Sequence, residues 1–88
     1  MSRPLWWLSF CDGSLPKGSQ FLGACIVPAA NMADACREAW RRGCNPGGEV
    51  CGVQFSADVP VHDGWIGRLM NKEEASGWTP GSAPTVRL

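Results

Sequence analysis

Two glycine-rich polar segments of this chain contain residue types that bind anions in proteins. Residues 11–20 read Cys-Asp-Gly-Ser-Leu-Pro-Lys-Gly-Ser-Gln, and residues 43–48 read Gly-Cys-Asn-Pro-Gly-Gly. Glycine lets backbone N–H groups approach a phosphate or carboxylate closely, and basic side chains nearby supply the opposite charge. The pattern therefore favours a small phosphorylated, nucleotide-like ligand. The candidate ligand-binding residues here are Asp12, Lys17, Ser19, Arg41, Arg42, Asn45, Gly47 and Gly48.

A purely structural interpretation of the same residues stays open. Neither segment matches a P-loop or a G-x-G-x-x-G motif, and the helix expected before residues 43–48 presents its C-terminus, whose dipole repels anions. On this interpretation the glycines only permit positive φ angles and Pro46 stiffens a turn. Arg41 and Arg42 would then complement the negative end of the helix.

Two apolar runs flank the first polar segment and predict strands. Residues 5–10 follow Pro4, and residues 21–27 precede Pro28, so both runs are bounded by residues that interrupt regular structure. The stretch between them is too long for a two-residue hairpin turn. We therefore expect two antiparallel strands joined by a protruding loop.

Residues 32–42 predict the main helix of the chain. Asn31 suits the N-cap position, and Gly43 suits the left-handed residue that ends a helix. Side chains at three- and four-residue steps form an apolar stripe, and we expect Trp40 to anchor this helix to the sheet. The stripe comprises Met32, Cys36, Ala39 and Trp40.

Residues 49–55 alternate in the way that predicts a third strand. A crossover through the helix makes this strand parallel to residues 21–27, while the place of residues 5–10 in the sheet stays open. The expected fold class is α+β, a small β-β-α-β sheet with one main helix on one face. Because the helix returns the chain to the end where residues 21–27 begin, the two polar segments should meet at one edge.

The C-terminal third carries weaker signals. Residues 65–70 fit either a short strand or a helical turn, and Asn71 followed by acidic residues resembles a capping box. This pattern predicts a short C-terminal helix that ends near Gly77. We expect one compact domain over residues 1–77 and a Pro/Gly-rich tail over residues 78–88.

Adjacent tryptophans on the first predicted strand must point to opposite faces of the sheet. The face of Trp6, Leu8 and Phe10 is the more apolar one and should meet the helix. Trp7 then lies on the second face, where it is a further candidate ligand-binding residue or part of a homodimer contact. Alternatively, the segment after Phe55 folds over Trp7.

Charge and hydropathy restrict the partners and the compartment. The chain has 8 basic and 8 acidic residues, a balance that lacks the positive field needed to bind bulk nucleic acid. No apolar stretch is long enough for a membrane span, and the first residues do not form a secretory signal. We therefore expect a cytoplasmic protein without a membrane partner. A thin core favours a homo-oligomer.

The cysteines and the single histidine predict no metal, cofactor or catalytic site. The 5 cysteines contain no C-x-x-C pair, which is typical of free and mostly buried thiols. Cys11 or Cys44 with His62 could act as nucleophile and base, but the expected topology separates them. A small Cys/His enzyme is thus the third hypothesis, and we expect a protein that is not an enzyme.

Residues 6–12, 16–23 and 43–50 resemble short proteins of bacteriophages and prophages whose roles are unassigned. The resemblance spans about the first two thirds of the chain. It implies a phage accessory protein that acts by binding in the host cytoplasm. We expect it to sequester a small phosphorylated ligand at the edge formed by residues 11–20 and 43–48. The alternative is an inhibitor of a host defence protein that uses an exposed Trp-bearing sheet face.

Overall fold

The computed structural model describes residues 3–78 and 86–87 of the chain. Within them, strands and helices agree closely with the expected elements, and the sheet has one additional short strand. The elements in chain order are β1 (Leu5–Cys11), β2 (Phe21–Pro28), α1 (Met32–Arg41), β3 (Glu49–Gln54), the 3-10 turn η1 (Asp63–Trp65), α2 (Lys72–Ser76) and β4 (Val86–Arg87).

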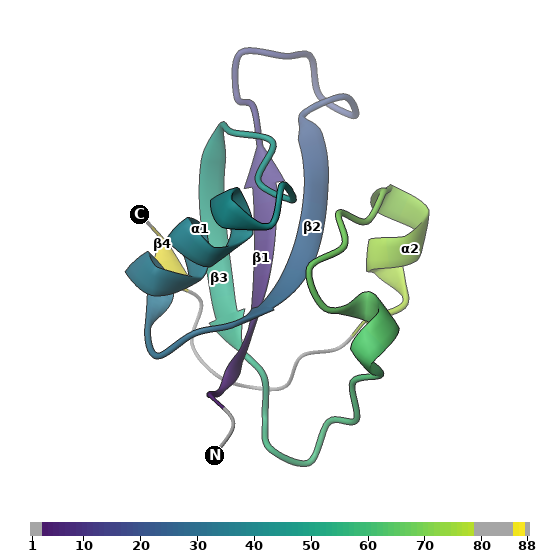
Figure 1. Cartoon of the computed structure of the whole chain (residues 1–88). Helices are drawn as coiled ribbons and strands as arrows, with labels where there is room; N and C mark the ends of the chain where they lie inside the picture. Colours follow the sequence, from purple (N-terminus) through teal and green to yellow (C-terminus); the bar gives the residue numbers. More distant parts are fainter. Residues whose placement is uncertain (1–2, 79–85, 88) are drawn as a thin grey trace.

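The sheet has the strand order β2-β1-β3-β4, and every neighbouring pair is antiparallel. β2 and β3 therefore run in the same direction, as the helical crossover predicts, and β1 lies between them (Figure 1). The expected α+β fold is confirmed, with α1 on one face and the short helix α2 near the C-terminus. The position of β1, which the sequence left open, is the centre of the first three strands.

The ends of both helices follow the expected capping chemistry. Asn31 accepts a hydrogen bond from the backbone of Asp34, and Gly43 has a φ of 76° after the end of α1. Asn71 and Glu74 form a complete capping box at the start of α2. These local signals place both helices in the sequence.

The main core lies between the sheet and α1. Its sheet side carries Trp6, Leu8 and Phe10, as predicted, and the indole N–H of Trp6 donates a 3.1 Å hydrogen bond to the carbonyl of Ala29. The end of the Met32 side chain fills the space above Gly52, where an added Cβ would require it to move. The buried residues of this cluster are Trp6, Leu8, Phe10, Cys25, Val27, Ala29, Met32, Ala35, Ala39 and Cys44.

The prediction that Trp40 anchors α1 is wrong, because its side chain is 71% exposed. α1 instead buries Met32, Ala35 and Ala39 against the sheet. The aromatic volume of the core comes from the strands, so the helix approaches through small side chains. Trp40 follows Ala39 by one residue, about 100° further around the helix, and points away from the core.

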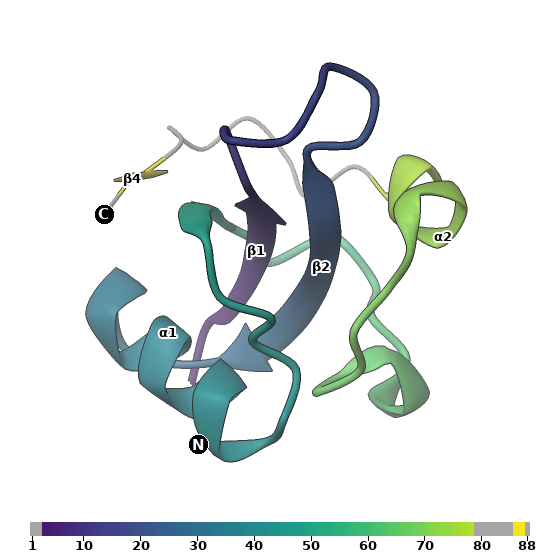
Figure 2. The ribbon, with the colours of Figure 1, turned by 90° about the horizontal axis from the view of Figure 1, so that it is seen from above.

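The second face of the sheet is covered by the segment after Phe55, which confirms the alternative expected for Trp7. Trp78 lies at the centre of this cover, with its ring centroid 6.3 Å from Trp7, 6.0 Å from Phe55 and 5.7 Å from Trp65. Ile26, Phe55 and Met70 are buried there. Figure 2 shows α1 and α2 on different sides of the strands.

Residues 66–70 lie along the outer edge of β2. Gly67 donates a backbone hydrogen bond of 2.8 Å to Ile26, and Met70 and Ala24 exchange two, of 2.7 and 3.1 Å. Ile66 and Met70 form isolated bridges with β2, so residues 66–70 are neither a regular strand nor a helical turn. The bonds occupy backbone groups that an open edge strand would present to other chains.

The domain extends beyond the predicted limit at residue 77. Trp78 packs into the second core cluster, and Val86–Arg87 pairs with β3. The rest of the predicted tail, residues 79–85 and 88, lies outside the described residues. No helix in the described ranges is long and apolar enough to cross a membrane.

Candidate functional site

The two polar loops meet at one edge of the sheet, as their connectivity predicts. Cys11 at the end of β1 pairs with Glu49 at the start of β3. Gly48 has a φ of +80°, and a Cβ on it would lie 2.5 Å from the carbonyl oxygen of Cys11 and 2.8 Å from Cδ1 of Leu22. The end of the second loop therefore lies directly against the start of the first, near the protruding loop at the top of Figure 1.

Several polar groups of the first loop, residues 11–20, form hydrogen bonds with other residues of the same loop. The carboxylate of Asp12 accepts hydrogen bonds from the hydroxyl of Ser14 at 2.6 Å and from its backbone N–H at 2.9 Å. These two bonds hold the pKa of Asp12 below its usual value, so its negative charge is retained at neutral pH. The backbone N–H of Ser19 donates to Pro16, whereas Lys17 is exposed.

The second loop also satisfies its own polar groups. Asn45 accepts a 2.9 Å hydrogen bond from the backbone of Gly47 and donates one of 3.5 Å to the carbonyl of Cys36. The Gly47 N–H that could face an anion therefore already has a partner. Together with the carboxylate of Asp12, this arrangement gives an anion less favourable surroundings than the residue types alone suggest.

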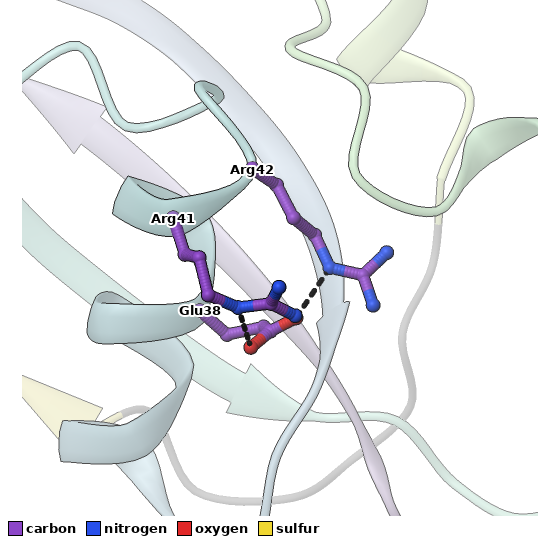
Figure 3. A network of polar contacts seen from close by, with 3 residues as sticks. All are labelled: Glu38, Arg41 and Arg42. Atoms are coloured by element: carbon purple, nitrogen blue, oxygen red, sulfur yellow. Dashed lines mark hydrogen bonds and ion pairs between the residues drawn. The ribbon is translucent and has the colours of Figure 1, made fainter.

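Arg41 and Arg42 are directed to Glu38 (Figure 3). Arg41 donates through Nε at 3.0 Å and through Nη2 at 2.5 Å, and Arg42 donates through Nε at 2.5 Å. The hydrogen bonds from Arg41, followed by that from Arg42, lower the pKa of Glu38 to about 2. Glu38 is therefore ionised at neutral pH and holds both guanidinium groups.

Arg42 also links α1 to residues 66–70, which lie along the outer edge of β2. A Cβ on Gly67 would lie 3.2 Å from both Cδ and Nη1 of Arg42, so the arginine stem packs over this glycine. Trp7 points to the second face of the sheet, away from α1. The structure thus brings the two loops together. Arg41 and Arg42 instead bind Glu38 on α1, and Trp7 packs on the second face of the sheet.

Cys11 pairs with Glu49 at the start of β3, so it lies at the opposite end of that strand from the segment with His62. Cys44 is buried beside Cys25, and the thiol–thiol hydrogen bond raises the pKa of Cys25 and lowers that of Cys44. His62 follows the other end of β3, where its Nδ1 accepts a 3.0 Å hydrogen bond from Gly64. In the described part of the chain, no group of three ligating side chains could hold a metal ion.

A cavity of about 310 Å³ opens at the end of the sheet opposite the two loops. The walls come from the start of β1 with the residues before it and from the end of β3 with the residues after it, and a 2.9 Å hydrogen bond runs from the backbone N–H of Phe55 to the carbonyl of Leu5. Sequence analysis missed this cavity because no local pattern marks it. Its lining includes Arg3, Leu5, Gln54, Phe55, Ser56 and Val59.

The outward side of α1 presents the most exposed large hydrophobic side chain among the described residues. Trp40 is 71% exposed, and the next, Leu69, is 40% exposed. Ala33, Arg37 and Arg41 are exposed on the same side of the helix, at the steps of one helical face. We call these four residues the outer face of α1. Sequence analysis missed it because it assigned Trp40 to the core.

Comparisons with known proteins give no indication of function, so the proposals below rest on the structure of this chain. No family model matches the chain, and no curated protein or solved structure matches it. The resemblance to phage proteins therefore stays a prediction.

Proposed function

We propose that this protein acts by binding another protein through the outer face of α1, with Trp40 at the centre of the contact. The observation that carries the proposal is the exposure of Trp40, because the other four tryptophans are buried or half-buried in the two core clusters. Tryptophan and arginine are the residue types that most often dominate the energy of protein interfaces. Tryptophan is enriched at protein interfaces, and the indole of Trp40 belongs to neither core cluster.

The helix that carries the outer face of α1 is capped and packed against the sheet. Asn31 caps the start of the helix, and Ala35 and Ala39 hold its inner side against the sheet. Near the other end, Glu38 binds both Arg41 and Arg42. Binding therefore costs little conformational entropy in the helix backbone.

In the phage setting that the sequence resemblance implies, the partner would be a host protein.

Replacing Trp40 by alanine tests this proposal. The wild-type protein and Trp40→Ala would be immobilised in equal amounts and exposed to host-cell extract, and each captured protein would be purified and titrated against both forms by calorimetry. We expect at least one purified partner to lose about tenfold or more in affinity for Trp40→Ala, because an interface tryptophan commonly contributes over 1 kcal/mol.

Thermal unfolding of the same variant supplies the control. Trp40 is exposed, so Trp40→Ala should unfold at nearly the wild-type temperature. If every captured protein binds both forms with equal affinity, the outer face of α1 is not the contact and the proposal fails.

A second candidate function is the sequestration of a small phosphorylated ligand at the edge of the two polar loops. The observation that favours it is the direct contact of these loops at Gly48 and Cys11, beside a loop that carries the exposed Lys17. This function requires a ligand to compete with the internal hydrogen bonds of Asn45 and Asp12.

A nucleotide panel in a thermal-shift assay tests the second candidate. A ligand present at 100 times its dissociation constant would stabilise the protein by about 2.7 kcal/mol, and Lys17→Ala would weaken that stabilisation. Lys72→Ala is the matched control, because Lys72 is also an exposed lysine but lies in α2. Equal shifts for both variants, or no shift with any nucleotide, would exclude this edge as a phosphate site.

A further inference from the structure

We infer that the outer face of α1 recognises an acidic protein segment, whose carboxylates contact Arg37 and Arg41 around Trp40. This inference rests on the proposed function and adds the chemistry of the partner. It follows from how the charges of this helix are layered, because the basic groups lie outside and the acidic groups lie beneath them.

The exposures of the paired side chains show this layering. The side chain of Arg37 is 75% exposed and that of its partner Asp34 is 34% exposed. The side chain of Arg41 is 71% exposed, whereas that of Glu38 is only 16% exposed. A partner that approaches α1 therefore meets guanidinium groups and an indole ring before it meets carboxylates.

Glu38 leaves part of the Arg41 guanidinium free for a second acceptor. Arg41 uses Nε and Nη2 for Glu38, and a guanidinium carries five N–H donors. The bidentate contact fixes the plane of the group, so the N–H bonds that remain on Nη1 and Nη2 have a defined direction. A carboxylate from a partner can accept these bonds without displacing Glu38.

Charge also argues against two other partners. In a two-fold contact between copies of this chain, the outer face of α1 meets itself, and that face carries two arginines and no carboxylate to pair with them. For a nucleic acid, two arginines already paired with Asp34 and Glu38, on a chain whose formal net charge is 0, supply little of the positive field that a row of phosphates needs. An acidic side-chain cluster next to an apolar residue is small enough to contact the guanidinium groups alone.

A library of short random peptides selected against the immobilised full-length protein tests the inference. We expect the enriched peptides to be rich in Asp and Glu around an apolar residue. One such peptide, made synthetically, should bind about tenfold more weakly to Trp40→Ala and to Arg37→Ala/Arg41→Ala, and more weakly as NaCl is raised. Lys72→Ala removes a positive charge elsewhere on the surface and should bind like wild type.

The outcomes separate this inference from the proposed function. Peptides that depend on Trp40 but show no acidic bias and no loss with Arg37→Ala/Arg41→Ala overturn the acidic partner and leave the proposed function intact. Selection of no peptide that depends on Trp40 counts against both. Trp40-dependent binding of a single-stranded oligonucleotide, tested beside the peptide, would also overturn the acidic protein partner. Circular dichroism of each variant confirms that α1 is retained.

Discussion

Replacing Trp78 by alanine should lower the free energy of unfolding by about 2–3 kcal/mol. The ring of Trp78 packs edge-on against Phe55 and Trp65 and tilted against Trp7, with centroid distances of 5.7 to 6.3 Å. Its loss removes the centre of the cover on the second sheet face. Urea titration followed by circular dichroism measures the change, and the unfolding temperature should fall by about 10 °C or more.

Trp40→Ala is the matched control for Trp78→Ala, because the residue change is identical and only the surroundings differ. Trp40 is 71% exposed, so its removal should change the free energy of unfolding by less than about 0.5 kcal/mol. Equal losses in the two variants would contradict this division into one tryptophan that stabilises the fold and one that is free for a partner.

Gly48→Ala should be the second strongly destabilising change, with a loss of about 2–4 kcal/mol. Its φ of +80° disfavours an L side chain, and its Cβ would lie 2.5 Å from the carbonyl oxygen of Cys11. That oxygen belongs to the backbone, so the chain itself must shift. The free energy of unfolding in urea measures the loss.

Gly47→Ala separates the two causes. Gly47 has a similar φ of +88°, but no atom lies within 4 Å of where its Cβ would be. This variant should therefore lose only about 1 kcal/mol, from the backbone conformation alone. If both variants lose the same amount, the two polar loops are not in the close contact that the structure shows.

Local signals were enough to predict most elements of the fold. Proline and glycine residues mark the limits of the strands, and Asn31 and Asn71 cap the helices where expected. Chain connectivity also predicted that the two polar loops share an edge, because a strand, a returning helix and a second strand leave few alternatives. The alternation of side chains along β1 also predicted that the face of the sheet with Trp6 meets α1.

The role of each tryptophan could not be predicted in the same way. The spacing of Met32, Cys36, Ala39 and Trp40 fits an apolar stripe, yet Ala35 and Ala39 form the inner side of α1 with Met32. Two stripes that overlap on one helix differ by a small rotation, and the partner surface selects between them. Here the sheet supplies the large side chains, so the helix presents small ones and leaves Trp40 outside.

The candidate site shows the same limit. Residue types indicated anion-binding groups in the two loops and at the end of α1, but types do not show which groups already have partners. Helical spacing of three and four residues lets Glu38 bind both Arg41 and Arg42. The backbone of Gly47 likewise has its acceptor in Asn45. Both contacts use groups that the residue types alone had suggested were free for an anion.

The approximate bounds of β1, β2, α1, β3 and α2, and the meeting of the two polar loops, could be predicted from the chain alone because they depend on neighbours along it. By contrast, it took the packed fold to show that Trp78 covers Trp7 and that Trp40 stays in contact with solvent. The physical reason is that burial depends on how much space facing elements leave for one another. That space is a property of the packed sheet and helix, and no single segment encodes it.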